Sequence, residues 1–218
     1  MSRVSDIKRI VITGGPCGGK TTTLKVLPKY LKNLGYSVII VPEIATEFLN
    51  NGISTDEEGL DPLDFEEQIL KEQLSREERY LEMARKLKTK RPVIVVSDRG
   101  TMDGAAYLER GDFETIVHRL GYIIPQINSE RYDGVFHLVT AAIGAEEFYT
   151  RDNNKIRKES LEEARELDLR TRSAWETHPN FYVISNLTED GNKIGFEDKK
   201  RLLFEALCKF IKLSYTGF

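Results

Sequence analysis

A glycine-rich segment near the amino terminus has the residue types that bind phosphate groups. Gly14 is followed by four residues and then by Gly19-Lys20-Thr21, which fits the pattern G-x-x-x-x-G-K-[ST]. In such a loop, backbone N–H groups surround the anion, the lysine reaches the β- and γ-phosphates, and the hydroxyl coordinates Mg²⁺. We expect the triphosphate to be bound by Gly14, Gly15, Pro16, Cys17, Gly18, Gly19, Lys20, Thr21 and Thr22.

Two further segments place charged side chains directly after apolar runs. Val41-Pro42-Glu43 ends one run, and Val96-Ser97-Asp98-Arg99 ends another. Ligands of open α/β sheets gather beyond the carboxyl ends of the strands, so both segments supply candidate site residues.

Each of these charged side chains has a candidate role and an ordinary structural alternative. Glu43 is a candidate general base or acceptor-positioning residue, and a helix-start glutamate is the alternative. Asp98 is a candidate Mg²⁺ ligand with Thr21, and a turn-capping aspartate is the alternative. Arg99 offers a planar fork for phosphate or an acidic substrate, and we count it with Lys20 among the candidate catalytic residues.

Two more groups of side chains could complete such a site. Asp103 and Tyr107 lie one helical turn apart and would face the same cleft, although a helix cap and a packed aromatic ring explain them equally well. The segment 148–157 holds three cations in a polar loop. We expect it to be a lid whose Arg157 closes over the phosphates as a catalytic residue, and an exposed basic loop is the alternative.

The rest of the sequence predicts the elements that must position these residues. A mostly parallel sheet, covered by helices on both faces, is indicated by apolar β-branched runs that alternate with helical patterns. The five expected strands are Ile7 to Thr13, Ser37 to Val41, Val93 to Ser97, Val135 to Thr140 and Phe181 to Ile184.

Two helices have clear boundary signals. One begins with Asp61 as N-cap and Pro62 in the first turn and should continue to about Lys88. The other begins at Ser160, where Ser-Leu-Glu-Glu has the spacing of a capping box, and should end at His178-Pro179.

Length and composition set the remaining limits. We expect one α/β domain over residues 1–218, with a lid insertion at about 144–178. The formal charge of −3 gives no global basic field, so nucleic acid is not an expected partner, and no apolar run is long enough to cross a membrane. Two widely separated cysteines, Cys17 and Cys208, favour a cytoplasmic protein, while any protein partner stays unassigned.

Together these motifs resemble those of a known family. The strings GGPCGGKTTTL, VPEIATEFL, SDRGTMDGAAY, YDGVFHLVTAAIGAEEFYT and HPNFYVISN look like the NadR-like P-loop domains, which are often classed as AAA-type ATPase domains. That family includes nicotinamide riboside kinases and the GTP-binding NTPase domain of the TRPL translocation-defect proteins. The likeness is greater to the TRPL branch and extends from Ile7 to about Leu213.

The resemblance implies a three-layer α/β P-loop NTPase fold with a five-stranded sheet and a helical lid insertion. It also implies that Gly14 to Thr21 bind the triphosphate, that Asp98 assists Mg²⁺, and that Arg157 belongs to the lid. The acceptor residues stay unassigned by this resemblance.

Two functions remain open from the sequence. One is a Mg²⁺-dependent kinase or NTPase that uses ATP or GTP and passes the γ-phosphoryl group to a small, nucleoside-like acceptor or to water. The other is a regulatory nucleotide-binding module that switches a partner interaction through ordered loops. A Ras-like GTPase is disfavoured because Asn192-Lys193-Ile194-Gly195 lacks the aspartate that reads guanine, but the choice between ATP and GTP stays open.

Overall fold

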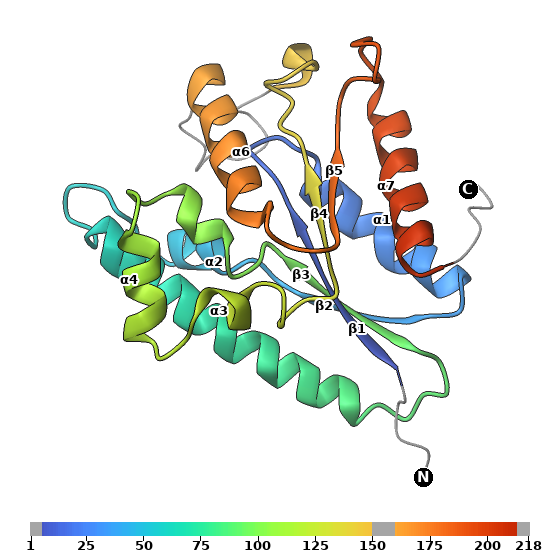
Figure 1. Ribbon diagram of the computed structural model, residues 1–218, viewed down its shortest axis with the longest axis horizontal. Coiled ribbons are helices and arrows are strands. Elements are labelled where there is room, and N and C mark those ends of the chain that lie inside the picture. Colours follow the sequence, from blue (N-terminus) through green and yellow to red (C-terminus); the bar gives the residue numbers. More distant parts are fainter. Residues whose placement is uncertain (1–5, 150–159, 213–218) are drawn as a thin grey trace.

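A five-stranded parallel sheet forms the centre of the computed structural model, which describes residues 6–149 and 160–212. Its strand order is β2-β3-β1-β4-β5, and every neighbouring pair is parallel, so the predicted α/β sheet is confirmed (Figure 1). The strands are β1 (Ile7–Thr13), β2 (Ser37–Val41), β3 (Val93–Asp98), β4 (Gly134–Leu138) and β5 (Phe181–Ile184).

Two strands differ slightly from their predicted bounds. β3 extends by one residue to Asp98, whose partner is Ile12 of β1. β4 starts one residue earlier than predicted, and it ends at Leu138 rather than Thr140 because its neighbour β5 ends at the facing residue, Ile184. The apolar run therefore continues past the point where pairing stops.

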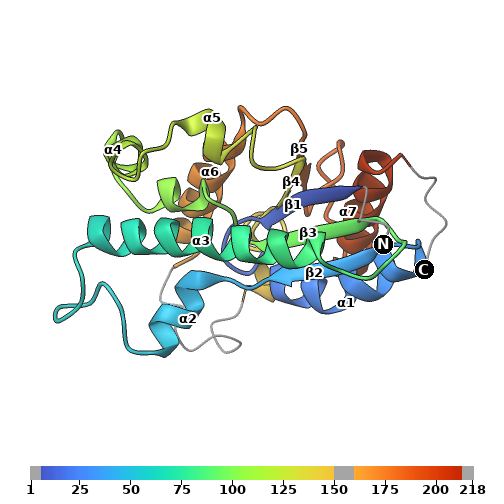
Figure 2. The ribbon, with the colours of Figure 1, turned by 90° about the horizontal axis from the view of Figure 1, so that it is seen from below.

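Helices cover both faces of this sheet. α1 (Lys20–Asn33) and α7 (Phe196–Phe210) lie on one face, and the longest helix, α3 (Pro62–Arg85), lies on the other with α4 (Asp112–Arg119) and α6 (Leu161–Trp175) (Figures 1 and 2). The shorter elements are α2 (Ile44–Asn50), η1 (Asp103–Ala106), α5 (Ile124–Ile127) and η2 (Glu146–Phe148). Within the described residues, no helix is long and apolar enough to cross a membrane.

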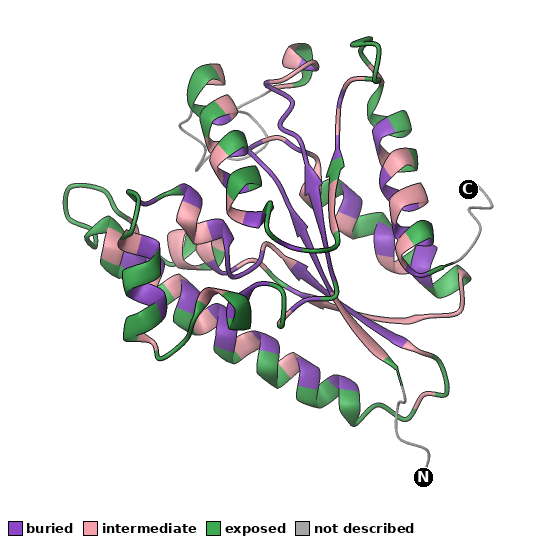
Figure 3. Cartoon of the chain, in the orientation of Figure 1, coloured by how far each residue is buried: buried purple, intermediate pink, exposed green. Residues whose placement is uncertain are grey.

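Alternation along the central strand explains the layers. Ile10 and Ile12 of β1 pack with Leu27 of α1 and Leu203 of α7, whereas Val11 points to the opposite cluster with Trp175 of α6. Strands β3 and β4 and the second half of β1 are buried between the helical layers, whereas the edge strands β2 and β5 are mostly partly exposed (Figure 3). Full burial of one such side chain contributes about 1.5–3 kcal/mol, so the two clusters fix the helices on their respective faces.

The two helices with clear boundary signals begin where predicted. Asp61 accepts a hydrogen bond from the Leu63 N–H at 2.9 Å, and Ser160 forms the predicted capping box with Glu163. α3 ends at Arg85, short of Lys88, because the next two N–H groups bond to carbonyls only three residues back. α6 likewise ends at Trp175, before the predicted His178.

Candidate functional site

The phosphate-binding motif adopts the strand–loop–helix arrangement that it requires. It joins β1 to α1, and Lys20 is the first residue of that helix. Gly14 has φ +135°, and a Cβ atom there would lie 2.0 Å from the Leu138 carbonyl oxygen. Gly19 has φ +92° and caps α1. Glycine is therefore required at both ends of the loop, by close approach to β4 and by left-handed backbone.

The Lys20 side chain lies along the inside of the loop. Its Nζ donates to the carbonyl oxygens of Gly14 at 2.7 Å and Gly15 at 2.9 Å. Burial lowers the pKa of the Lys20 ammonium to about 8; Arg99 adds to this shift, and three nearby carboxylates oppose it. A triphosphate in the loop would favour the charged form, because opposite charge stabilises an ammonium group.

Two buried charged residues that the sequence analysis missed, Asp168 and Lys199, form hydrogen bonds with the backbone of the phosphate loop. Asp168 of α6 accepts from the N–H groups of Gly15 at 2.9 Å and Thr140 at 2.8 Å. Lys199 of α7 donates from Nζ to the Gly18 carbonyl oxygen at 2.9 Å, and burial lowers its pKa to about 7. The loop is thus attached to one helix from each face of the sheet.

A signal for Asp168 does exist in the sequence. The buried residues of α6 are Ala164, Asp168, Thr171 and Trp175, which recur at four-, three- and four-residue intervals. This spacing puts Asp168 on the inward face of the helix. The surrounding charges make α6 look like a solvated helix, which hides that one of its carboxylates is buried.

The charged residues after β2 and β3 meet beside the phosphate loop. Arg99 Nε donates to Glu43 Oε1 at 2.6 Å, and Arg99 Nη1 lies 3.4 Å from Asp103 Oδ2. Burial opposes ionisation of Glu43, but Arg99 and the Thr46 hydroxyl outweigh it and hold the Glu43 pKa below its usual value. Glu43 is the N-cap residue of α2, although its side chain makes no capping hydrogen bond.

Arg99 has an uncommon backbone conformation. Its φ is +64°, in the left-handed region that non-glycine residues rarely adopt, and Cys17 in the phosphate loop has φ +54°. Such residues cost of order 1–2 kcal/mol and persist where their surroundings fix them, often at functional sites. Here the Arg99 N–H donates to Ile12 O at 3.0 Å, so β1 helps to hold the turn.

The Asp103 side chain is buried and hydrogen-bonded, whereas the Tyr107 side chain is exposed. Asp103 is 4% exposed and accepts from the Thr13 hydroxyl at 2.8 Å and from Trp175 Nε1 at 2.6 Å. Tyr107 is 41% exposed, which does not fit a packed aromatic ring. Both residues line the same cavity, as expected from their spacing of one helical turn.

The Asp98 carboxylate is a suitable ligand for a cation. It has no hydrogen-bond partner within the described residues, which does not support the turn-capping alternative. Burial raises the pKa of Asp98 to about 6, and the neighbouring Glu43 carboxylate adds to the rise. Thr21 and Thr22 lie exposed in the first turn of α1, where the Thr21 hydroxyl is accessible to ligands. These donors fit Mg²⁺, a cation that usually takes one or two protein oxygens and keeps several waters.

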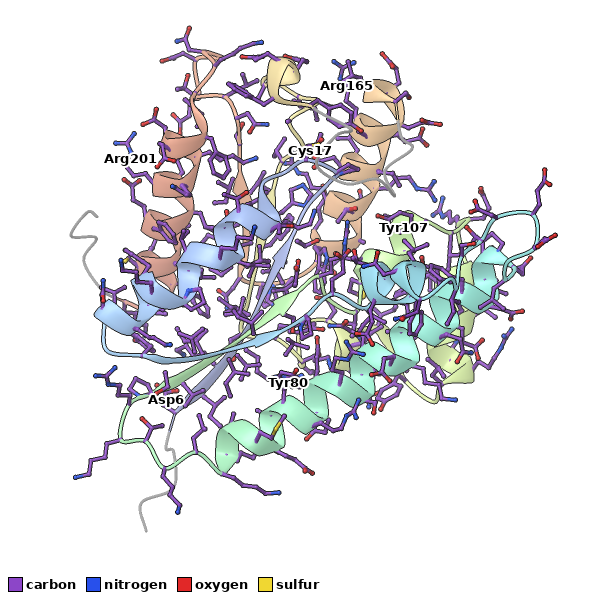
Figure 4. All side chains as sticks on the ribbon, turned by 180° about the vertical axis from the view of Figure 1, so that it is seen from behind. Asp6, Cys17, Tyr80, Tyr107, Arg165 and Arg201 are labelled. Carbon is purple, nitrogen blue, oxygen red and sulfur yellow. The ribbon has the colours of Figure 1, made fainter. Side chains whose placement is uncertain are left out.

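A cavity of about 410 Å³ adjoins the loop at the carboxyl edge of the sheet. In Figure 4, Asp6 marks the amino end of β1, and Cys17 and Tyr107 lie toward the opposite end of the sheet. The cavity is lined by Pro16 of the loop, by Glu43 and Arg99, and by residues of α2, α3 and η1. The α3 residues include Pro62, Glu66, Ile69, Leu70 and Gln73, whose helical spacing presents one face of the helix to the cavity.

The predicted lid cannot be placed in the same way. Arg157 and its neighbours 150–159 lie outside the described residues. Within the proposed insertion, α6 is described, and it packs into the domain through fully buried Trp175.

The segment after β5 has structural partners. The Asn186 amide donates to the carbonyl oxygens of Thr140 and Ile143, both at 2.7 Å, and so fixes the loop after β4. Lys193 pairs with Glu146 at 2.9 Å and with Glu147 at 3.4 Å.

Comparisons with known proteins agree with this geometry. A family model described as an AAA domain matches residues 9–191. The chain belongs to this AAA domain family. No curated protein sequence matches the chain.

Two solved structures share the fold of this AAA domain. A thymidylate kinase from Ehrlichia chaffeensis superposes with a TM-score of 0.61 at 16% identity, covering 93% of this chain and 99% of that one. The NadR protein in complex with NR gives a TM-score of 0.62 at 17% identity, covering 97% of this chain but only 52% of that one, so the chain spans about half the length of NadR. These comparisons do not distinguish the TRPL branch, which stays a prediction.

Proposed function

We propose that this AAA domain is a P-loop phosphotransferase that moves the γ-phosphoryl group of ATP or GTP to a small hydroxyl compound. The position of the cavity supports this proposal. Pro16 of the phosphate loop lines the cavity on one side, and the ion pair between Glu43 and Arg99 also lines it. An acceptor in this cavity would lie next to the triphosphate. Holding two reactants side by side supplies much of the rate of such a transfer.

The transfer requires few bond changes. The acceptor oxygen forms a bond to the γ-phosphorus, and the bond from that phosphorus to the β–γ bridging oxygen breaks. The electron pair leaves with the nucleoside diphosphate. The hydroxyl proton passes to the ionised Glu43, whose position beside Arg99 is fixed by a 2.6 Å bond.

Charge stabilisation comes from the residues around the phosphates. Lys20 would neutralise negative charge on the transferring group, and Arg99 would orient Glu43. Thr21 and Asp98 would hold Mg²⁺, which supplies charge neutralisation of the phosphate oxygens when bound. Arg157 is retained as a lid residue on its sequence position alone.

The sequence strings also support two finer assignments. We place the chain nearer to the TRPL branch of the family because its HLVTAA and GAEEFYT strings look like that branch. We also retain a cytoplasmic location, which the spacing of the two cysteines favours.

One experiment tests the proposal directly. The protein is incubated with Mg²⁺ and ATP or GTP, alone and with a pool of small metabolites, and phosphorylated products are identified by mass spectrometry. An acceptor-dependent product that Lys20→Ala fails to form is the expected result. Slow release of phosphate without any acceptor product would instead favour a regulatory nucleotide switch.

A further inference from the structure

The buried Lys199 ammonium is a charged group that the proposed transfer does not use. It lies in the first turn of α7, is 3% exposed and forms no ion pair within the described residues. Its Nζ instead donates to the carbonyl oxygens of Gly18 at 2.9 Å and Val139 at 2.5 Å. The helix dipole also opposes a cation in the first turn of a helix. Buried charges are usually paired, so a lysine in this position points to an anion that binds nearby.

The hydrogen bond from Lys199 determines which way one peptide group of the phosphate loop faces. In a trans peptide the C=O and the following N–H point in opposite directions, and the described residues contain no cis peptide bond. Because the Gly18 carbonyl oxygen faces Lys199, the Gly19 N–H faces away from it. This N–H donates to no acceptor within the described residues. It is therefore free to bind an anion in the loop, together with the first N–H groups of α1.

The same helix makes a second contact with this peptide. A Cβ atom at Gly19 would lie 2.5 Å from a ring carbon of Phe196, so the ring packs directly against the Gly19 backbone. Phe196 and Lys199 are three residues apart and lie on one face of α7. The position of α7 is fixed by the core cluster that it shares with α1 (Figure 1). One helix therefore contacts both residues of the Gly18–Gly19 peptide.

The charged groups around Lys199 come from each of the elements that surround the loop. Asp168 of α6 and Lys20 of α1 both act on its charge. His137 of β4 lies behind Asp168, with 3.2 Å between His137 Nε2 and Asp168 Oδ2. The neighbouring charges on α7 itself form pairs, Glu197 with Lys200 and Asp198 with Arg201.

The ionisation of Lys199 depends on the charge in the loop. Burial lowers the pKa of the Lys199 ammonium to about 7; Asp168 opposes this shift, and Lys20 adds to it. In the free protein at pH 7, about half of the molecules therefore carry an uncharged Lys199. Because the charge of Lys20 acts on Lys199, a phosphate group bound beside Lys20 acts on it with the opposite sign. A bound triphosphate therefore favours the charged form of Lys199.

We propose that Lys199 is a positioning residue for the triphosphate, which directs the Gly19 N–H toward the anion and takes up a proton when the anion binds. The proton comes from the solvent and is held by Nζ, and no covalent bond to the ligand forms. This inference rests on the proposed function, because it requires a triphosphate in the loop. It adds a residue of α7 to the binding machinery and makes nucleotide affinity dependent on pH.

Calorimetry on the wild-type protein tests the proton uptake. Mg-ATP and Mg-GTP are each titrated at pH 7 in two buffers with different ionisation enthalpies, and the difference in heat gives the number of protons exchanged. We expect uptake of about 0.5 proton per nucleotide, because Lys199 is half charged beforehand, whereas Lys20, with a pKa of about 8, is already mainly charged. No uptake, or net release, would overturn the inference. Failure to bind either nucleotide would contradict the proposed function itself.

Matched variants assign this proton to Lys199. Lys199→Met keeps the length of the side chain but removes the ammonium, and Lys209→Met, at an exposed position of the same helix, is the control. Dissociation constants are measured at pH 6, 7 and 8, where titration of Lys20 and of the nucleotide affects all the proteins alike. The ratio of the Lys199→Met constant to the wild-type constant should fall by about tenfold from pH 6 to pH 8, because wild type loses its lysine charge over this range. The ratio for Lys209→Met should stay near one.

A structural role of Lys199 alone gives a different pattern. Lys199→Met would then weaken binding by the same factor at each pH, and this result would overturn the inference. Lys199→Arg, whose charge does not titrate in this range, should bind nucleotide at pH 6 nearly as well as wild type and lose the pH dependence. Urea unfolding without nucleotide verifies that the variants are folded, and the calorimetric result on wild type does not depend on them.

Discussion

The charged residues at the site act on one another, so their properties belong to a cluster rather than to single side chains. Glu43 raises the pKa of Asp98, whereas Arg99 and Lys20 oppose that rise. A ligand that adds charge at one position therefore changes the ionisation of the others. The sequence predicted that these residues lie at strand ends, but it could not show the 2.6 Å hydrogen bond that pairs Arg99 with Glu43.

Asp98→Asn tests the metal assignment at the residue scale. The amide keeps the size of the side chain but removes the negative charge that would hold Mg²⁺. We expect Mg²⁺-dependent turnover to fall by about a hundredfold, while nucleotide affinity measured without metal stays unchanged. Steady-state rates across a Mg²⁺ titration, with nucleotide titrations in EDTA, measure the two effects. Turnover at the wild-type rate would contradict the assignment.

Glu66 also makes a prediction about stability and pH. Burial raises the pKa of its carboxyl to about 8 in the folded protein from an ordinary value of 4.5, so the folded state binds more protons between these pH values. The contribution of Glu66 is fully present below pH 4.5 and is lost as pH rises through 8, with a slope of at most about 1.4 kcal/mol per pH unit. Urea unfolding of wild type and Glu66→Gln at pH 5, 6, 7 and 8 should show this slope in wild type relative to the variant. Parallel pH profiles would refute it.

At the scale of elements, α6 connects the two halves of the site. Asp168 contacts the phosphate loop through Gly15, and Trp175, two turns later, donates to Asp103 beside the cavity. One helix therefore contacts both the phosphate loop and a residue that lines the cavity. The sequence showed the capping box of α6 and its charged surface, but not these two inward contacts.

Asp168→Ala measures the contribution of α6 to the loop. It leaves two buried N–H groups, those of Gly15 and Thr140, without their acceptor, and each such loss costs about 1–3 kcal/mol. We expect the free energy of unfolding to fall by about 3 kcal/mol and nucleotide affinity to fall with it. Glu166→Ala, on the exposed face of the same helix, is the control and should change stability by less than about 0.5 kcal/mol. Similar unfolding curves for the two variants would contradict the role of Asp168.

The parts of the fold that could be predicted are those whose limits are set by the hydrophobic pattern of the segment itself. Three strands, β1, β2 and β5, have the bounds of their apolar runs, because hydrophobic pattern and pairing end together there. The predicted end of β4 was too late, because its apolar run continues past the residue where pairing with β5 stops. The point where pairing stops depends on β5, and the sequence of β4 alone does not show it. Glu66 and Lys199 were missed for a related reason. Each is a polar residue within an ordinary helix, and only the packing of other elements against it shows that it is buried.

At the scale of the whole molecule, the phosphate loop is attached to both helical layers. Asp168 reaches it from the α6 side of the sheet and Lys199 from the α7 side. The Gly14 backbone also packs closely against the end of β4. Ordering of this loop by a ligand should therefore stabilise the domain as one unit rather than a single helix.

Ligand-linked stability tests this view and the loop together. A ligand that binds only the folded state stabilises it by about 2.7 kcal/mol at a hundredfold excess over its dissociation constant. For a domain of this size, that corresponds to an increase in Tm of roughly 5–10 °C. We expect Mg-ATP or Mg-GTP to produce one cooperative transition at the higher temperature, recorded alike by circular dichroism and by fluorescence of buried Trp175. Lys20→Ala should remove most of the increase, because Nζ would supply the positive charge that binds the β- and γ-phosphates. An unchanged wild-type Tm with both nucleotides would refute nucleotide binding, whereas a shift seen by only one of the two probes would show that the layers respond separately.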